Sequence, residues 1–141
     1  MSSNQQVVER AFDAWSRGES HVSDIFDPDM RWEIVGRSAA AGTYLSAQQF
    51  VAEVLQPFAS RFSPDAPFRP VRVRSTHADG DTVVVVWDGE GTTRVGTTYA
   101  NVYAWFLTMR DGLVVDATAF FDSIAFDELW HGVPIAEPAS S

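Results

Sequence analysis

The chain has 141 residues, of which 45% are hydrophobic, a formal net charge of −9 and no cysteine. This length suits one domain whose core needs no covalent cross-links, and the lack of cysteine excludes disulfides, thiol nucleophiles and thiolate metal ligands. The negative charge disfavours nucleic acid and anionic membrane surfaces as partners, and no apolar run approaches the length of a membrane span. We therefore expect a cytoplasmic protein with no nucleic-acid or membrane partner.

The N-terminal part of the sequence is patterned for helices. Residues 4–17 place apolar side chains at the helical period, and Gly18 follows as a stop signal. The expected core stripe of this helix is Val8, Ala11, Phe12 and Trp15. A short second helix is predicted over 21–26, and residues 27–29 (Asp-Pro-Asp) are predicted as the turn that ends it.

A strand and a third helix follow. The segment RWEIVG predicts a strand with Trp32 and Ile34 on one face. Ser46 and Gln49 have the spacing of a capping box, which predicts a helix start. Pro57 is expected to kink this helix, because proline removes a backbone donor.

From residue 68 onward the hydrophobic period changes from helical to two. Gly-containing turns separate four predicted strands, which span 68–78, 81–90, 94–109 and 113–121. Asp122 then reads as the N-cap of a last helix, a structural role. The sequence therefore predicts an α+β fold in which helices come first and an antiparallel sheet follows. Residues 1–131 are expected to form one domain, and 132–141 a C-terminal tail.

Two of the predicted strands, VVVVW and VYAWFL, are apolar on both faces. An antiparallel sheet with one wet face should alternate instead, so each face needs a cover. Helices can cover one face, and a second subunit is the economical cover for the other. We expect a homodimer through an outer sheet face that carries Val83, Val85, Trp87, Val102, Phe106 and Phe120.

Three segments carry a family resemblance. They are WEIVGRSAAAGTY, the strand YANVYAWFLTMRDG, and ATAFFD before the closing helix. The chain resembles the SnoaL-like polyketide cyclase family from about Val7 to Trp130. That family lies in the nuclear-transport-factor-2-like superfamily, with ketosteroid isomerases and limonene-epoxide hydrolases. The resemblance implies a cone in which a strongly curved sheet wraps a long helix around an apolar pocket, commonly dimeric through the outer sheet face.

The resemblance carries over few catalytic acids. The general-base aspartate of ketosteroid isomerases corresponds to Ile34, and the acid/base aspartate of SnoaL-type cyclases maps near Ala119. The Arg-x-Asp of limonene-epoxide hydrolases matches residues 86–88 (Val-Trp-Asp), where Asp88 alone keeps its carboxylate. These departures favour altered chemistry or none.

Asp88 has two interpretations that the sequence leaves open. The dipeptide Asp-Gly is typical of a solvated turn, whereas the family match points Asp88 into the pocket together with Val84 and Val86. In the pocket, desolvation would raise its pKa and suit it to general acid or base work. Asn101 and Tyr103 would then hold the carboxyl group or a substrate oxygen. The other residues expected around the ligand are Trp32, Ile34, Tyr44, Val84, Val86, Trp105, Ala117, Ala119 and Phe121.

Two classes of function remain open. The first is a cofactor-independent acid/base enzyme of the cyclase, isomerase or epoxide hydrolase type, acting on a small lipophilic substrate. The second is a non-catalytic ligand-binding or assembly module. No metal site is expected, because His21, His77 and His131 lie on separate elements. No cofactor is expected either, since phosphate loops, nucleophile elbows and dinucleotide fingerprints are missing from the sequence.

Overall fold

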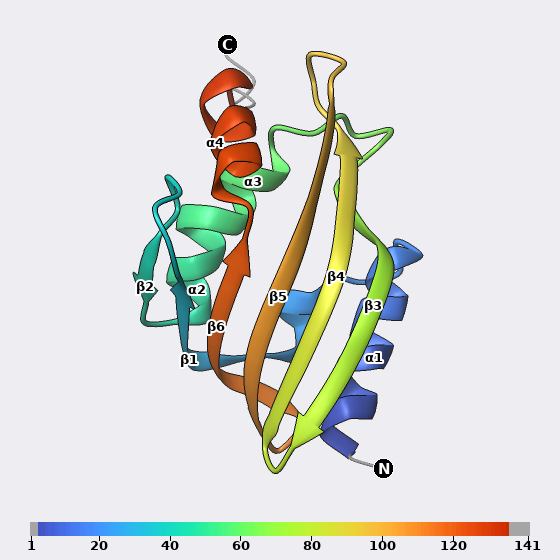
Figure 1. Cartoon of the computed structure of the whole chain (residues 1–141), viewed down its shortest axis with the longest axis vertical. Coiled ribbons are helices and arrows are strands. Elements are labelled where there is room, and N and C mark those ends of the chain that lie inside the picture. Colours follow the sequence, from blue (N-terminus) through green and yellow to red (C-terminus); the bar gives the residue numbers. More distant parts are fainter. Residues whose placement is uncertain (1–2, 136–141) are drawn as a thin grey trace.

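The computed structural model describes residues 3–135, and Figure 1 shows their arrangement. A curved sheet has α1 packed behind β3 and β4, and the other helices lie toward the opposite edge. The described elements are α1 (Ser3–Ser16), η1 (Val22–Ile25), β1 (Phe26–Ile34), β2 (Gly42–Tyr44), α2 (Ala47–Phe50), η2 (Val51–Leu55), α3 (Gln56–Ala59), β3 (Arg69–Asp79), β4 (Thr82–Thr92), β5 (Thr98–Arg110), β6 (Leu113–Phe121) and α4 (Ser123–Gly132). None of these helices has the length and hydropathy needed to cross a membrane.

The six strands form one sheet in the order β2-β1-β6-β5-β4-β3. The predicted α+β class, with a strongly curved sheet wrapped around a long helix, is confirmed. The expectation of a wholly antiparallel sheet was too simple, because β1 runs parallel to β6. An ion pair of 2.8 Å between Arg31 Nε and Asp116 Oδ1 bridges these two strands.

The first helix forms as predicted and supplies the inner layer. Val8, Phe12 and Trp15 are buried against the sheet. Gly18 has φ +74°, which glycine adopts at little cost, and this lets the chain leave the helix.

The predicted turn at residues 27–29 was wrong, because these residues lie inside β1. The preceding helix is a single 3₁₀ turn, η1, and the strand begins at Phe26. The Asp27 side chain accepts a hydrogen bond from the Asp29 backbone N–H at 2.9 Å. The β1–β6 register shifts across this segment, so an irregular strand accommodates the proline.

The third helix starts where the capping pattern places it. Ser46 Oγ accepts a hydrogen bond from Gln49 N at 3.0 Å, and Gln49 Oε1 accepts one from Leu45 N at 2.7 Å. Its middle turn, η2, is a π-helical turn just before Pro57. The expected disturbance by proline therefore takes the form of a widened turn.

The faces of β4 are the reverse of those predicted. Val83, Val85 and Trp87 are at most 1% exposed and face the core, whereas Val84, Val86 and Asp88 lie on the outer face. The cause is the pairing with β5, in which Trp87 lies opposite Tyr103 and Val85 opposite Trp105. Paired residues share a face, so the inward side chains of β5 fix the inward side chains of β4.

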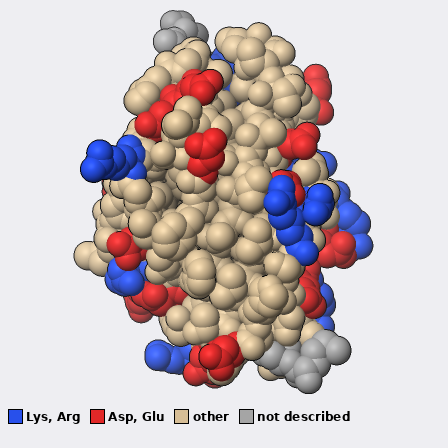
Figure 2. Space-filling view, in the orientation of Figure 1, with Lys and Arg blue, Asp and Glu red and all other residues tan. Residues whose placement is uncertain are grey.

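The outer face of the sheet is uncharged at its centre. Val102, Phe106 and Phe120 lie there as predicted, each about two-fifths exposed. The rings of Phe106 and Phe120 are in contact, with centroids 5.8 Å apart. Figure 2 shows a broad uncharged surface over the middle of the sheet, with charged side chains mostly toward its margins.

Arg61 fastens the C-terminal end of the described chain. This arginine is 6% exposed and donates to the backbone carbonyls of Val133 (2.9 Å), Pro57 (2.7 Å) and Trp130 (3.1 Å). Its guanidinium carbon also lies 4.0 Å from the centre of the Trp130 ring. The beginning of the predicted tail 132–141 is thus packed, and residues 136–141 lie outside the described part.

Candidate functional site

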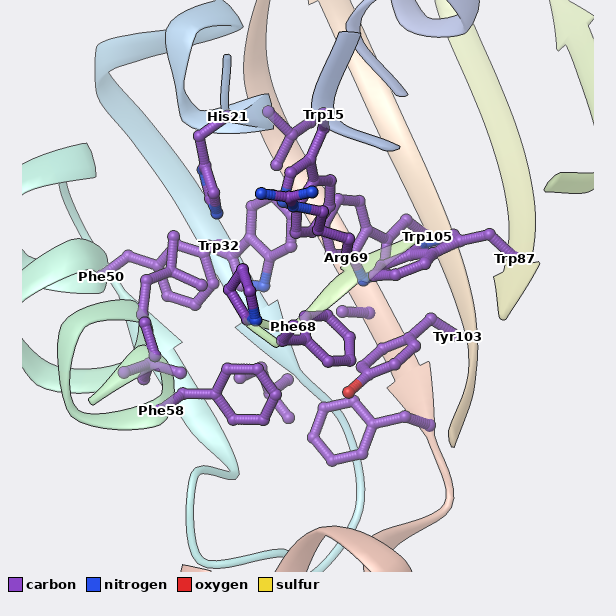
Figure 3. A pocket seen from close by; sticks show the side chains of 18 of the residues that line it. Trp15, His21, Trp32, Phe50, Phe58, Phe68, Arg69, Trp87, Tyr103 and Trp105 are labelled. Carbon is purple, nitrogen blue, oxygen red and sulfur yellow. The ribbon is translucent and has the colours of Figure 1, made fainter. Parts of the chain in front are cut away.

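A cavity of about 310 Å³ lies between the inner face of the sheet and the helices. Side chains from both layers converge on it (Figure 3). Its deep wall is made of buried residues from the sheet, namely Trp32, Ile34, Trp87, Tyr103, Trp105 and Ala119. Its mouth lies among more exposed residues, namely Gly18, Ser20, Ala59 and Pro67.

Aromatic rings give the cavity flat walls. Trp87 stacks on Tyr103 with centroids 4.4 Å apart and an interplanar angle of 12°. Trp32 stacks on Phe50 at 4.5 Å and 17°. Trp105 stands edge-on between these pairs, 4.9 Å from Trp32 and 5.0 Å from Trp87. Such rigid, apolar faces suit a flat ligand.

Tyr103 brings a hydroxyl group to the deep end of the cavity, on the side that faces Phe58 in Figure 3. Its hydroxyl lies 2.8 Å from that of Tyr99, which in turn accepts a hydrogen bond from Asn101 Nδ2 at 2.8 Å. Either hydroxyl can be the donor in this pair, because neither proton has another acceptor among the described residues. When Tyr99 is the donor, the Tyr103 proton is free for an acceptor in the cavity.

Asn101 supports this chain and does not itself reach a ligand. Its Nδ2 also donates to the Asp122 carbonyl at 3.0 Å, and its Oδ1 accepts from the backbone N–H groups of Val102 (2.8 Å) and Asp122 (3.2 Å). Both amide protons and both acceptor positions are therefore occupied. Asn101 therefore holds the Tyr99 hydroxyl and the backbone of Asp122, and it does not line the cavity. A catalytic role for it stays a prediction.

His21 occupies the opposite end of the cavity, against the ring of Trp15 at a centroid distance of 4.6 Å. Its Nδ1 accepts a hydrogen bond from the Ser23 backbone N–H at 3.0 Å. Burial lowers the pKa of His21 below its ordinary 6.5, although the nearby Asp24 carboxylate raises it. The neutral ring therefore carries its proton on Nε2, which makes Nε2 a donor.

Arg69, the first residue of β3, also lines the cavity. A Cβ atom built on Gly18 would lie 2.7 Å from Arg69 Nη2, so the guanidinium packs directly on this glycine. The side chain makes no ion pair with any residue of the described range. Glu19, near Gly18 in sequence, is paired with Arg17 at 3.1 Å.

Asp88 does not enter the cavity, which corrects the central expectation for the site. It lies on the outer face, where Arg74 Nε and Nη2 donate to its carboxylate at 2.9 and 3.0 Å. Hydrogen bonding to Arg74 lowers the pKa of Asp88, the opposite of the expected rise. No aspartate or glutamate is found among the lining residues of the described structure. Within the same range, no three potential metal-ligating side chains gather.

The expected ligand-binding residues divide into two groups. Those that line the cavity are Trp32, Ile34, Tyr103, Trp105, Ala119 and Phe121. Those that do not are Tyr44, Val84, Val86 and Ala117. Tyr44 lies at the rim of the fold, where its hydroxyl donates to the Ala40 carbonyl at 2.7 Å. Ala117 is fully buried beneath the wall.

Sequence reasoning missed the polar mouth of the cavity. His21 was counted only as a residue remote from the other histidines, and Arg69 was not singled out. The sequence holds one signal for His21, which follows the helix-stop residue Gly18 by three positions. The sequence carries no such signal for Arg69, because its side chain packs on Gly18, a residue far away in the sequence.

Comparison with known proteins agrees with the predicted resemblance. The SnoaL-like domain family matches residues 8–117. Among solved structures, an NTF2-like protein from Burkholderia thailandensis superposes with a TM-score of 0.71 at 24% identity, covering 92% of this chain and 98% of that one. Bal32a, from a soil-derived mobile gene cassette, gives 0.70 at 22% identity, with 90% and 95% covered.

A third structure, TerC co-crystallized with polyporic acid, gives a TM-score of 0.71 at 25% identity and covers 92% of this chain and 99% of TerC. No curated protein matches the sequence. Because the family match spans most of the chain and the fold agrees with it, the protein belongs to the SnoaL-like domain family.

Proposed function

We propose that the protein binds a small, flat, largely apolar molecule in the cavity between the sheet and the helices. The observation that carries the proposal is a space of about 310 Å³ that is walled by stacked aromatic rings and bordered by exposed residues. Small-molecule sites in proteins have volumes of about 300–1,000 Å³ and mostly apolar walls with few polar groups. The cavity has both properties.

Two further points support ligand binding. With Tyr99 donating to it, Tyr103 provides one hydrogen-bond donor at the deep end, which would orient a ligand that carries an oxygen acceptor. A protein of the same fold and 25% identity, TerC, was co-crystallized with polyporic acid. By analogy, we propose that this chain also binds a small molecule, and its own cavity is the place that we assign to it.

The test fills the mouth of the cavity and measures binding of a neutral aromatic probe, N-phenyl-1-naphthylamine, by its fluorescence. Ala59 is exposed and lines the mouth, so Ala59→Phe should block entry without disturbing the core. We expect saturable binding by the unmodified protein and at least about tenfold weaker binding by the variant. Ala52→Phe, at an exposed position of the same helical segment outside the cavity, is the matched control. Equal binding by both variants would refute the proposal.

A second candidate is a cofactor-independent enzyme that acts on a carbonyl compound. Tyr103 favours it, because a buried hydroxyl that donates to a carbonyl oxygen stabilises the negative charge that enolisation develops there. Such an enzyme would draw no base from Asp88, which lies on the outer face. We therefore propose binding as the primary function and carbonyl polarisation by Tyr103 as the chemistry that this site could add.

A further inference from the structure

We infer that the ligand carries an anionic oxygen group, a carboxylate or an enolate, which Arg69 and the Nε2–H of His21 bind at the mouth of the cavity. This inference rests on the proposed function and names the chemical class of its ligand. Its support comes from the partners of Arg69, the tautomer of His21 and the composition of the wall.

Arg69 is a cation without a protein counter-ion in an acidic protein. Its guanidinium packs on Gly18 and makes no ion pair with a residue in the described part of the chain. Glu19 is engaged by Arg17, and Glu90, the β4 partner of Arg69, is exposed and forms no ion pair with it. A guanidinium has five N–H donors arranged to hold a planar oxyanion.

His21 presents a second donor to the same cavity. Its Nδ1 is occupied by the Ser23 N–H, so the proton of the neutral ring lies on Nε2. Trp15 supports the ring from one side, and Trp15 also lines the cavity. The donor is thus held in a fixed orientation by packing and by a backbone hydrogen bond.

The residues that line the cavity favour an anionic ligand over a cationic one. Their titratable and charged members are His21, Arg69 and Tyr103, all of them donors, and the described lining contains no carboxylate. The protein as a whole has a net charge of −9, which repels anions. A cavity of donors inside an acidic protein therefore selects for an anionic group at one end of the ligand and against a cationic one.

The experiment compares two probes with the same aromatic skeleton. 8-Anilinonaphthalene-1-sulfonate carries an anionic group, and N-phenyl-1-naphthylamine lacks it. Arg69→Met should weaken binding of the anionic probe by at least about tenfold, the loss expected for a charge-assisted contact, and change binding of the neutral probe by less than about twofold. Arg72→Met makes the same change in net charge on the same strand outside the cavity and should leave both probes unaffected.

His21→Asn provides a second variant should Arg69→Met fold poorly. Asparagine can still accept the Ser23 N–H, but it withdraws the Nε2–H donor, so only the anionic probe should bind more weakly. Equal effects of these variants on both probes would overturn the inference while leaving the proposed function intact. If Ala59→Phe fails to weaken the neutral probe, the proposed function itself fails, and the inference falls with it.

Discussion

Tyr103 keeps its proton at any physiological pH, because burial raises its pKa well above the ordinary value. Burial likewise raises the pKa of Tyr99 to about 12. The Asn101 amide donates to the Tyr99 hydroxyl, which is hydrogen-bonded to the Tyr103 hydroxyl at the cavity. Because Tyr103 keeps its proton, it would not act as a base.

Tyr103→Phe removes this donor and keeps the ring that stacks on Trp87. We expect fluorenone, an aromatic ketone, to bind about fivefold more weakly to the variant, since one neutral hydrogen bond is worth about 1 kcal/mol. Fluorene, which lacks the carbonyl, should bind equally to both proteins. Parallel titrations of the two compounds provide the measurement, and an equal loss for both would assign Tyr103 a packing role only.

His21 predicts a pH dependence of stability. Because burial lowers its pKa below 6.5, the unfolded chain takes up this proton at a higher pH than the folded chain. The free energy of unfolding should therefore fall as the pH drops below about 6.5 and be insensitive to His21 above it. Asp24 is the charged group to which the ring responds, and its carboxylate raises the pKa. Urea denaturation between pH 8 and pH 5 should show a shallower decline for His21→Asn than for the unmodified protein, whereas His77→Asn, at an exposed site, should retain the full decline.

At the scale of elements, β4 and the segment before β3 meet through a glycine. A Cβ at Gly89 would collide with the ring of Phe68 and lie 2.9 Å from Trp87 Cζ3. Both aromatic residues line the cavity. The close approach of strand and ring thus sets one wall of the site.

Gly89→Ala should lower the free energy of unfolding by about 1–3 kcal/mol, the usual cost of overpacking a core, and should weaken probe binding as well. Gly132→Ala is the control, because an added Cβ there meets nothing within 4 Å and alanine favours the helix. Chemical denaturation of both variants checks the prediction. Equal stability would mean that Phe68 moves aside freely.

Most elements were predictable from the sequence to within a few residues because their periods and caps are local; the exceptions are β2 and the beginning of β1. The wrong prediction for the faces of β4 shows which information is not local, namely the pairing of this strand with β5. Its four valines fit either face, and Asp88 suggested the wrong one. The number of residues in the predicted turn contained the answer. Three turn residues between strands that end at 90 and begin at 94 pair odd positions with odd positions, as the longer connection between Thr92 and Thr98 in the structure also does. Trp87, and not Asp88, therefore had to share a face with Tyr103. By contrast, the placement of Arg69 rests on a contact with Gly18, a long-range contact that no period predicts.

At the scale of the whole molecule, the outer face of the sheet exposes apolar side chains that no element of the described monomer covers. Opposed residues on three strands form an apolar strip that consists of Val84, Val86, Val102, Ala104, Phe106 and Phe120. Burying apolar surface in an interface stabilises the complex by about 25 cal/mol per Å². Single exposed apolar residues are normal in a monomer, whereas a contiguous strip of this kind is typical of an interaction site. We propose that a second copy of the chain covers it.

Sedimentation at micromolar concentration should then give twice the monomer mass of 15.6 kDa. Phe106→Asp should produce a monomer, because it places a charge in the middle of the strip. Ile124→Asp, at a position that is 72% exposed on α4, should leave the dimer intact. A monomer for the unmodified protein would contradict the proposal.

The parallel pairing of β1 with β6 also constrains the order of assembly. The Arg31–Asp116 ion pair joins residues 85 positions apart, whereas β3, β4 and β5 pair with their immediate neighbours in sequence. Contacts between distant segments form late because closing a long loop costs entropy. During synthesis, β1 can pair with β6 only after β6 has left the ribosome. Ile34 pairs with Ala119, and Trp32 with Ala117, only when β6 docks. The step that completes the sheet is therefore the one that brings the cavity residues Trp32, Ile34 and Ala119 together.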